Sequence, residues 1–205
     1  KMEIILIDFV LHFDKYLETI LQNYGILTYL VLFIIIFMET GLVFTPLLPG
    51  DSLLFVAGTL AGSGLLRISL LFFILSIAAI VGDSLNYWIG NYFGRKISSG
   101  KFVKKEYLER TQEFYKKHGI KTIILARFVP IIRTFAPFVA GLGKMEYKKF
   151  FLFNTIGGIL WVAIFLYAGF FFGGIELIEK NLTYVIFGII FISLIPIFWE
   201  FLKKK

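Results

Sequence analysis

The chain has 205 residues, of which 58% are apolar and 25 are phenylalanine, and its mean hydropathy is +0.83. This excess of apolar residues excludes an ordinary soluble domain and favours an integral membrane protein. The absence of cysteine and the presence of two histidines exclude disulfides, thiolate sites and histidine-rich metal centres, so no metal or other cofactor is expected. The net charge of +7 is concentrated between residues 95 and 121 and at the three C-terminal lysines, which predicts that both regions are cytoplasmic and bind no nucleic acid.

The first 24 residues are predicted to form an amphipathic helix. Within residues 4–21, Asp8, His12, Lys15 and Thr19 fall on one helical stripe, and Ile, Leu and Phe occupy the rest. Such a helix lies in a membrane interface and does not cross it.

Residues 26–66 are apolar but interrupted, and we expect them to form a first re-entrant hairpin. Proline removes a backbone donor and disfavours helix before it, so this segment should not cross as one straight helix. Irregular backbone survives at membrane depth only where protein or a water-filled cavity covers it. The residues expected to shape this hairpin are Pro46, Pro49, Gly50 and Gly58.

The rest of the chain alternates between predicted spans and broken segments. A transmembrane helix is expected at 68–93, followed by a basic cytoplasmic loop at 95–121 that contains an amphipathic helix. A second re-entrant hairpin is expected at 122–143, shaped by Pro130, Pro137 and Gly141. Two further spans, at 150–175 and 182–202, reach the length that a bilayer requires.

The order amphipathic helix, hairpin and span thus occurs twice. Lysines flank the second hairpin, so it should open to the cytoplasm, whereas the first should open to the opposite side. The predicted fold is an all-α polytopic membrane protein, one domain over 1–205, with an inverted repeat and an additional C-terminal helix. Opposed hairpins of this kind form midplane sites in transporters.

Two carboxylates stand in the first hairpin. A charged side chain near the bilayer centre costs about 2.5–3.5 kcal/mol on insertion scales, so such residues usually have a function. Asp51 follows Pro49-Gly50 and is either a cap of the returning helix, a proton carrier, or both. Glu39 has no basic neighbour within one helical turn and is either a surface residue at a helix end or a partner of Arg127 or Arg133.

Arg127 and Arg133 flank Pro130 in the second hairpin. Guanidinium groups bind phosphate in a bidentate manner, so the pair is predicted to hold an anionic headgroup. The alternative is a structural role, in which they cap hairpin carbonyls or pair statically with the acids. Asp83 and Asn154 are weaker candidates, interpreted as packing or loop residues.

The chain resembles the DedA family, whose shared region is also called the VTT or SNARE-associated domain. The resemblance covers residues 39–161 and rests on the motifs E-T-G-L-V-F-T-P-L-L-P-G-D, G-D-S-L-N-Y-W-I-G-N-Y-F-G-R, A-R-F-V-P-I-I-R-T-F-A-P-F-V-A-G and F-N-T-I-G-G-I-L-W. It implies a multi-pass bacterial plasma-membrane protein that moves lipids between leaflets, with functional acids at Glu39 and Asp51 and functional arginines at Arg127 and Arg133.

We therefore predict a transporter that moves undecaprenyl phosphate or a phospholipid between leaflets and is coupled to the proton gradient. The alternatives are a proton-coupled carrier of a small ion and a non-transporting membrane organiser. No nucleotide-binding, metalloprotease or serine-hydrolase motif is present in the sequence, so no enzyme activity is expected. Small-residue faces leave homo-oligomerisation open.

Overall fold

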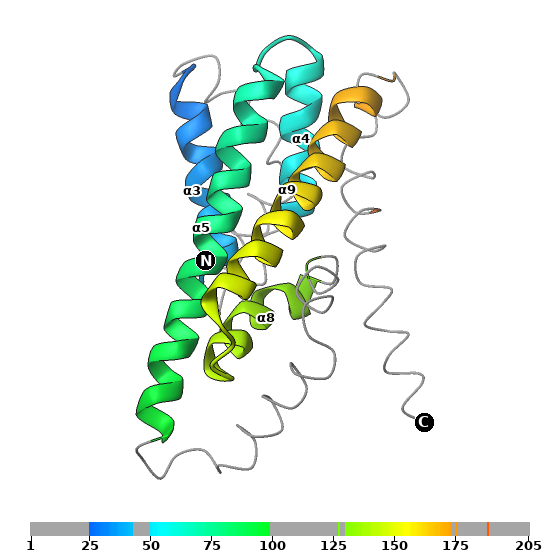
Figure 1. Ribbon diagram of the computed structural model, residues 1–205. Coiled ribbons are helices and arrows are strands. Elements are labelled where there is room, and N and C mark those ends of the chain that lie inside the picture. The colour runs from blue at the N-terminus through cyan, green and yellow to red at the C-terminus, as the bar shows by residue number, and fades with distance from the viewer. Residues whose placement is uncertain are drawn as a thin grey trace, which may run out of the picture. The chain divides into compact units, whose positions relative to one another are not determined.

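The computed structural model describes residues 25–42, 50–98, 127, 130–173, 175 and 188 (Figure 1). Every element within these ranges is an α-helix: α3 Leu27–Gly41, α4 Gly50–Gly62, α5 Ile68–Ser98, α8 Pro130–Leu142 and α9 Tyr147–Phe172. The predicted N-terminal helix at 1–24, the loop helix at 101–118 and the span at 182–202 lie outside the described residues.

Two helices are long and apolar enough to cross a membrane. The spans Ile68–Phe93 of α5 and Tyr147–Phe172 of α9 contain 26 residues each, or about 39 Å of helix against a hydrocarbon core of about 30 Å. The buried core helix of a soluble protein would cover its large apolar side chains, whereas Phe73 and Ile77 are 64% and 53% exposed on α5 and Ile164 is 51% exposed on α9. These surfaces suit contact with lipid, and the chain is an all-α membrane protein.

The first broken segment contains two short helices. α3 has 15 residues and α4 has 13, so neither reaches the about 20 residues of a full span. α4 begins at Gly50, and Asp51 lies in its first turn, where a carboxylate compensates the positive end of the helix dipole. Pro46 and Pro49 lie outside the described residues.

The second broken segment is described from Pro130 onward. Pro130 is the first residue of α8, a position that needs no backbone donor. Pro137 lies inside the same helix, which continues to Leu142. A proline at this position cannot donate to the carbonyl of Arg133, four residues earlier.

α4 and α8 end in the same type of turn. At the end of α4, Leu65 N donates to Leu60 O (3.1 Å) and Gly64 N donates to Ala61 O (3.1 Å). The corresponding bonds after α8 run from Met145 N to Ala140 O (3.0 Å) and from Lys144 N to Gly141 O (3.0 Å). These are Schellman motifs, with Gly64 (φ 80°) and Lys144 (φ 55°) at the left-handed position.

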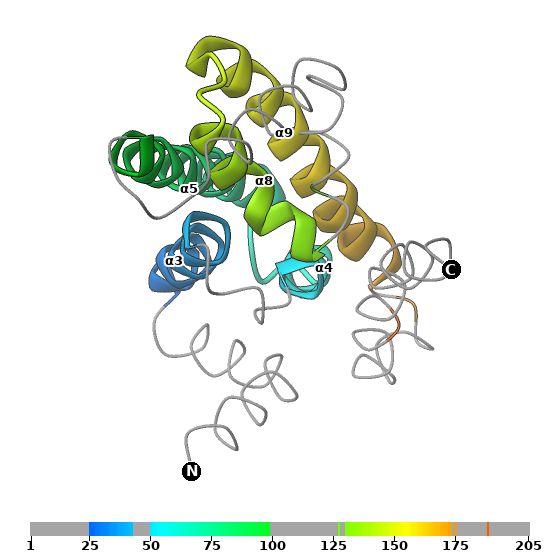
Figure 2. The same ribbon diagram turned by 90° about the horizontal axis from the view of Figure 1, so that it is seen from below.

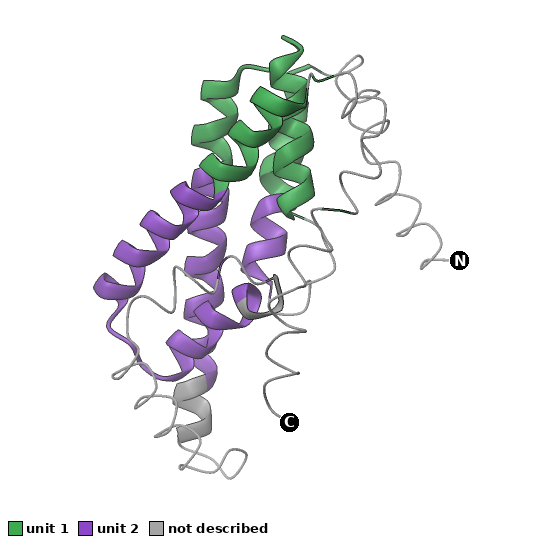
Figure 3. Ribbon diagram, turned by 90° about the vertical axis from the view of Figure 1, so that its right-hand side faces the viewer, with its two compact units in different colours: residues 1–35, 47–75, 162–205 green, residues 36–46, 76–161 purple. Residues whose placement is uncertain are grey.

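The chain divides into two compact units (Figure 3). Unit 1 contains residues 1–35, 47–75 and 162–205, and unit 2 contains residues 36–46 and 76–161. α4 lies in unit 1 and α8 in unit 2, while α3, α5 and α9 contribute segments to both.

The tetrapeptide F-V-A-G makes an equivalent contact in each unit. In unit 1 it is Phe55–Gly58 of α4, and a Cβ on Gly58 would lie 2.0 Å from Leu166 O of α9, while one on Gly169 would lie 1.9 Å from Phe55 O. Both distances are far below van der Waals contact, so only glycine permits the two backbones to approach this closely.

In unit 2 the tetrapeptide is Phe138–Gly141 of α8, which lies against α5 (Figure 2). A Cβ on Gly141 would lie 2.0 Å from Tyr87 O, and one on Gly90 would lie 2.0 Å from Phe138 O. α4 therefore packs on α9 and α8 packs on α5, in each case through glycines that lie against backbone carbonyls. Each of these long helices comes from the other half of the sequence.

Candidate functional site

A buried ion pair joins α3 to α8 within unit 2. Arg133 Nη2 donates to Glu39 Oε1, and the two side chains are 3% and 1% exposed. The guanidinium carbon of Arg133 also lies 4.6 Å from the ring centroid of Trp161 on α9, a cation–π distance. The interpretation of Glu39 as a surface residue is wrong, and its partner is one of the two arginines expected from the sequence.

A second buried arginine is held by α5 and α9. Arg127 Nη2 donates to Asp83 Oδ2 and to Asn154 Oδ1, and all three side chains are at least 98% buried. The amide nitrogen of Asn154 fixes the orientation of the side chain, because Nδ2 donates to Ile80 O at 3.0 Å. This orientation directs the amide oxygen at the cation.

Gly158 of α9 makes room for this second arginine. A Cβ at Gly158 would lie 3.2 Å from Arg127 Nη1 and 3.1 Å from a side-chain carbon of Ile80. Asn154, Gly158 and Trp161 follow one another at helical spacing, so one stripe of α9 presents an amide, a gap and an aromatic ring. That stripe contacts both arginines.

Arg127 has N–H donors that bind no acceptor among the described residues. Its Nε and Nη1 are buried and lack a hydrogen-bond partner there, as does Oδ1 of Asp83. A buried donor without a partner costs about 1–3 kcal/mol. Among the described residues of unit 2, this guanidinium therefore has hydrogen-bonding capacity left for an anion.

The predicted site residues divide between the units. Glu39, Arg127 and Arg133 lie in unit 2, together with the hairpin residues Pro130, Pro137 and Gly141. Asp51 lies in unit 1 with Gly50 and Gly58, and its side chain is 8% exposed. Its position in the first turn of α4 agrees with the capping interpretation.

Comparison with known proteins places this architecture in a family. Residues 48–171 match the VTT domain family. Protein DedA of Escherichia coli K12 is 53% identical over 205 residues, which cover 98% of this chain and 94% of that protein. The chain belongs to the DedA family of membrane proteins. An uncharacterized membrane protein of Mycobacterium leprae is 45% identical over 166 residues, or 80% of this chain and 74% of that protein.

A more distant relative is the inner membrane protein YqjA of Escherichia coli K12, which is 33% identical over 148 residues. These cover 71% of this chain and 67% of that protein. No solved structure matches the chain. The VTT match contains Asp51, Asp83, both arginines and the α9 stripe, whereas Glu39 precedes it.

Three residues of the candidate site contact the arginines although their sequence context favours packing. The interpretation of Asp83 and Asn154 as packing or loop residues is corrected, because both bind Arg127. The ring of Trp161 likewise contacts Arg133. The signal available was the stripe at 154, 158 and 161, which places a polar, a small and a large residue on one face of an apolar helix.

Proposed function

We propose that this DedA-family protein moves a lipid with a phosphate headgroup, undecaprenyl phosphate or a phospholipid, between the leaflets of the membrane. The observation that carries the proposal is the presence of two buried arginines in unit 2, each held by a carboxylate from a different helix. An intramembrane ionisable residue that is paired in this way typically marks a substrate or ion pathway.

Partner exchange is the chemistry that the arrangement supports. A phosphate oxygen accepts the same charge-assisted bonds from guanidinium as a carboxylate oxygen does, and it can accept two at once. A headgroup that enters the site would replace Glu39 on Arg133 or Asp83 on Arg127. The buried cation then keeps an anionic partner throughout, which avoids the large cost of an unpaired buried charge.

Protons provide the return step in this proposal. A proton that neutralises Glu39 lets a phosphate oxygen replace the carboxylate on Arg133 in the same step, so the guanidinium keeps an anionic partner. Loss of the proton restores the ion pair and releases the headgroup. Asp51 carries a proton in the same cycle, so the proton gradient drives net movement of the lipid.

We further propose that α4 and α8 belong to an inverted repeat of re-entrant hairpins in a single membrane domain. The equivalent glycine contacts of the two F-V-A-G segments and the matching Schellman turns support the repeat. The short lengths of α3, α4 and α8 support hairpins, because none of them is long enough to span.

Location in the bacterial inner membrane, with a cytoplasmic C-terminus, completes the proposal. One relative is named an inner membrane protein, and the lysine-rich C-terminus follows the positive-inside rule.

The experiment is leaflet exchange of fluorescent polyprenyl phosphate and fluorescent phospholipid in proteoliposomes, with and without an imposed pH gradient. We expect the wild-type protein to exchange one of the two lipids, and Arg133→Ala, Arg127→Ala and Asp51→Asn to lose that exchange. A matched control is Arg67→Ala, which removes the arginine that precedes the first residue of α5. Full exchange by Arg133→Ala would overturn the assignment.

The same vesicles separate the two rival functions. Proton-coupled movement of charge without lipid exchange would indicate an ion carrier. Absence of both fluxes, with Asp51→Asn less stable than the wild type, would indicate a membrane organiser. Because Glu39 and Asp83, two buried acids of unit 2, are each bound to a guanidinium group, this arrangement favours an anionic substrate over a cation.

A further inference from the structure

One buried amide connects the two helices that carry the Glu39–Arg133 ion pair. Asn86 of α5 is fully buried, and its Nδ2 donates to Thr40 O at 3.2 Å and to Thr134 O at 2.7 Å. Thr40 directly follows Glu39 on α3, and Thr134 directly follows Arg133 on α8. The amide therefore holds the backbone next to each member of the pair.

An amide nitrogen suits this position. Both acceptors are carbonyl oxygens, so the side-chain group between them must donate twice, and the nitrogen of Asn supplies two N–H groups in one plane. These two contacts also settle the orientation of the amide, because its oxygen could donate to neither carbonyl. A carboxylate of the same shape would place an acceptor against two acceptors.

The residues one turn before and after Asn86 explain why the helices come within its reach. A Cβ at Gly82 would lie 2.0 Å from Thr40 Oγ1 and 2.9 Å from Phe37 O, so α3 lies directly on the α5 backbone. At Gly90 a Cβ would lie 2.0 Å from Phe138 O of α8. Positions 82, 86 and 90 thus form one stripe of α5. The glycines at 82 and 90 allow α3 and α8 to approach closely, and the amide of Asn86 binds the backbones of both helices.

We infer that Asn86 is a positioning residue that sets the register of Glu39 against Arg133 by bridging the backbones of α3 and α8. The partner exchange described above requires the carboxylate and the guanidinium to separate and to meet again in the same geometry. A bridge to main-chain atoms fixes the two helices while leaving both charged side chains able to change partner. This inference rests on the proposed function only for its consequence in transport.

The primary test measures the relation between α3 and α8 without any transport assay. The chain has no native cysteine, so spin labels attach only where cysteines are introduced. Met38→Cys on α3 and Phe135→Cys on α8 replace side chains that are 40% and 42% exposed. Double electron–electron resonance then gives the distribution of distances between the two labels in proteoliposomes.

Two isosteric substitutions and one matched control complete the design. Asn86→Leu keeps the approximate volume without donors, and Asn86→Asp keeps the shape with acceptors in their place. Asn91→Leu is the same substitution five residues later on the same helix, at a partly buried side chain. We expect both Asn86 variants to shift or broaden the distribution and Asn91→Leu to match the wild type. If Asn86→Leu does not fold, Asn86→Ser, which retains a single donor, takes its place.

Transport by the same variants separates this inference from the proposed function. We expect the Asn86 variants to lose about tenfold in lipid exchange, which corresponds to the loss of about 1.4 kcal/mol. An unchanged distance distribution in Asn86→Leu overturns the bridge, whether or not the protein transports lipid. A changed distribution with wild-type exchange overturns the positioning role. If the Asn86 variants change the distance distribution and the wild-type protein exchanges neither lipid, the bridge is supported and the proposed function is overturned.

Discussion

The two units use the same backbone contact and differ in what surrounds it. In each, an F-V-A-G segment on a 13-residue helix packs against a long helix through a reciprocal pair of glycines. Unit 2 adds two buried ion pairs and the Asn86 bridge to this contact. The glycine contact is therefore common to both units, whereas the two buried ion pairs described above lie in unit 2.

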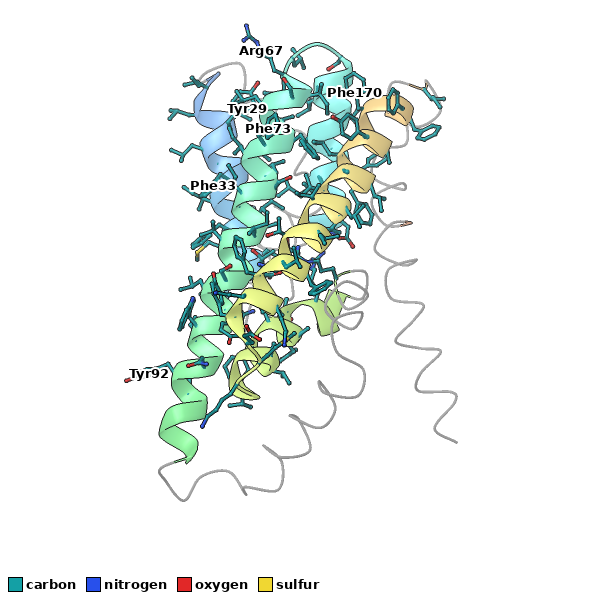
Figure 4. The ribbon with its side chains drawn as sticks, viewed as in Figure 1. Tyr29, Phe33, Arg67, Phe73, Tyr92 and Phe170 are labelled. Carbon is teal, nitrogen blue, oxygen red and sulfur yellow. The ribbon has the colours of Figure 1, made fainter. Side chains whose placement is uncertain are left out.

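Two polar contacts described in unit 1 are neutral hydrogen bonds. Thr59 Oγ1 donates to Phe55 O of its own helix at 3.1 Å and approaches Gly169 O at 3.4 Å. Tyr29, labelled on α3 in Figure 4, accepts a bond from the backbone N–H of Arg67 at 2.8 Å. Because a neutral hydrogen bond contributes about 1 kcal/mol and a broken buried ion pair costs several, substitutions that target one unit at a time should give different penalties.

The largest effect is expected from unpairing a buried charge in unit 2. Arg127→Met leaves Asp83 buried without its cation, and such a loss typically costs about 3–5 kcal/mol. Replacing both members, as in Arg127→Met with Asp83→Leu, should recover most of that stability, because no charge then remains unpaired. The measurement is the free energy of unfolding of the single and double variants in detergent.

The corresponding control is Thr59→Val in unit 1, which removes a hydroxyl and should cost about 0.5–1.5 kcal/mol. Equal penalties for Arg127→Met and Thr59→Val would show that the charged contact adds nothing to unit 2. Failure of the double variant to recover stability would indicate that Asn154 or the helix packing depends on the guanidinium itself.

The next effect tests whether the two glycine contacts are equivalent. Gly58→Ala and Gly141→Ala each place a Cβ 2.0 Å from a backbone carbonyl oxygen, which cannot move aside as a flexible side chain does. Overpacking of this kind costs about 1–3 kcal/mol, and we expect the two penalties to agree within about 0.5 kcal/mol. Thermal unfolding of both variants in detergent checks this.

Gly25→Ala separates the clash from backbone strain, because Gly25 has a positive φ of 43° and a Cβ placed there would have no atom within 4 Å. Its expected penalty is strain alone, about 1 kcal/mol. A penalty at Gly141 much larger than that at Gly58 would show that the contact in unit 2 also positions the charged residues.

The sequence predicted the helical class, the interruption of the first segment and the burial of Glu39, Asp51, Arg127 and Arg133 from local composition. Pro130 and the Gly50-Asp51 pair lie at the starts of α8 and α4, as their residue types favour. It did not identify which carboxylate meets which arginine, because Asp83 and Arg127 lie 44 residues apart and their contact depends on packing between helices. The contacts of Asn86 and Trp161 were missed for the same reason, since buried amides and rings in apolar helices are most often packing residues.

A smaller effect is expected from a single neutral hydrogen bond in unit 2. The hydroxyl of Tyr87 donates to Met145 O after α8, and the ring stacks on Phe150 with centroids 4.6 Å apart. Tyr87→Phe keeps the ring contact and leaves the carbonyl without this donor, so the expected loss is about 1 kcal/mol.

Tyr167→Phe in unit 1 is the matched control, because its ring packs on Phe72 at 5.9 Å and the side chain is only partly buried. We expect it to change the unfolding midpoint by less than Tyr87→Phe does. A larger loss at Tyr167 would contradict the view that the stronger polar contacts lie in unit 2.

The smallest effect is expected where unit 2 has an exposed ion pair. Lys149 Nζ lies 3.0 Å from Glu146 Oε2, three residues earlier, and the side chains are 61% and 57% exposed. Water and salt screen such a pair, so Lys149→Ala should cost about 0–0.5 kcal/mol, and less as salt is raised. The measurement is the unfolding free energy at low and high salt. Because this pair lies in the same unit as Glu39–Arg133, a penalty approaching that of Arg127→Met would show that charge pairing as such, and not its burial, distinguishes unit 2.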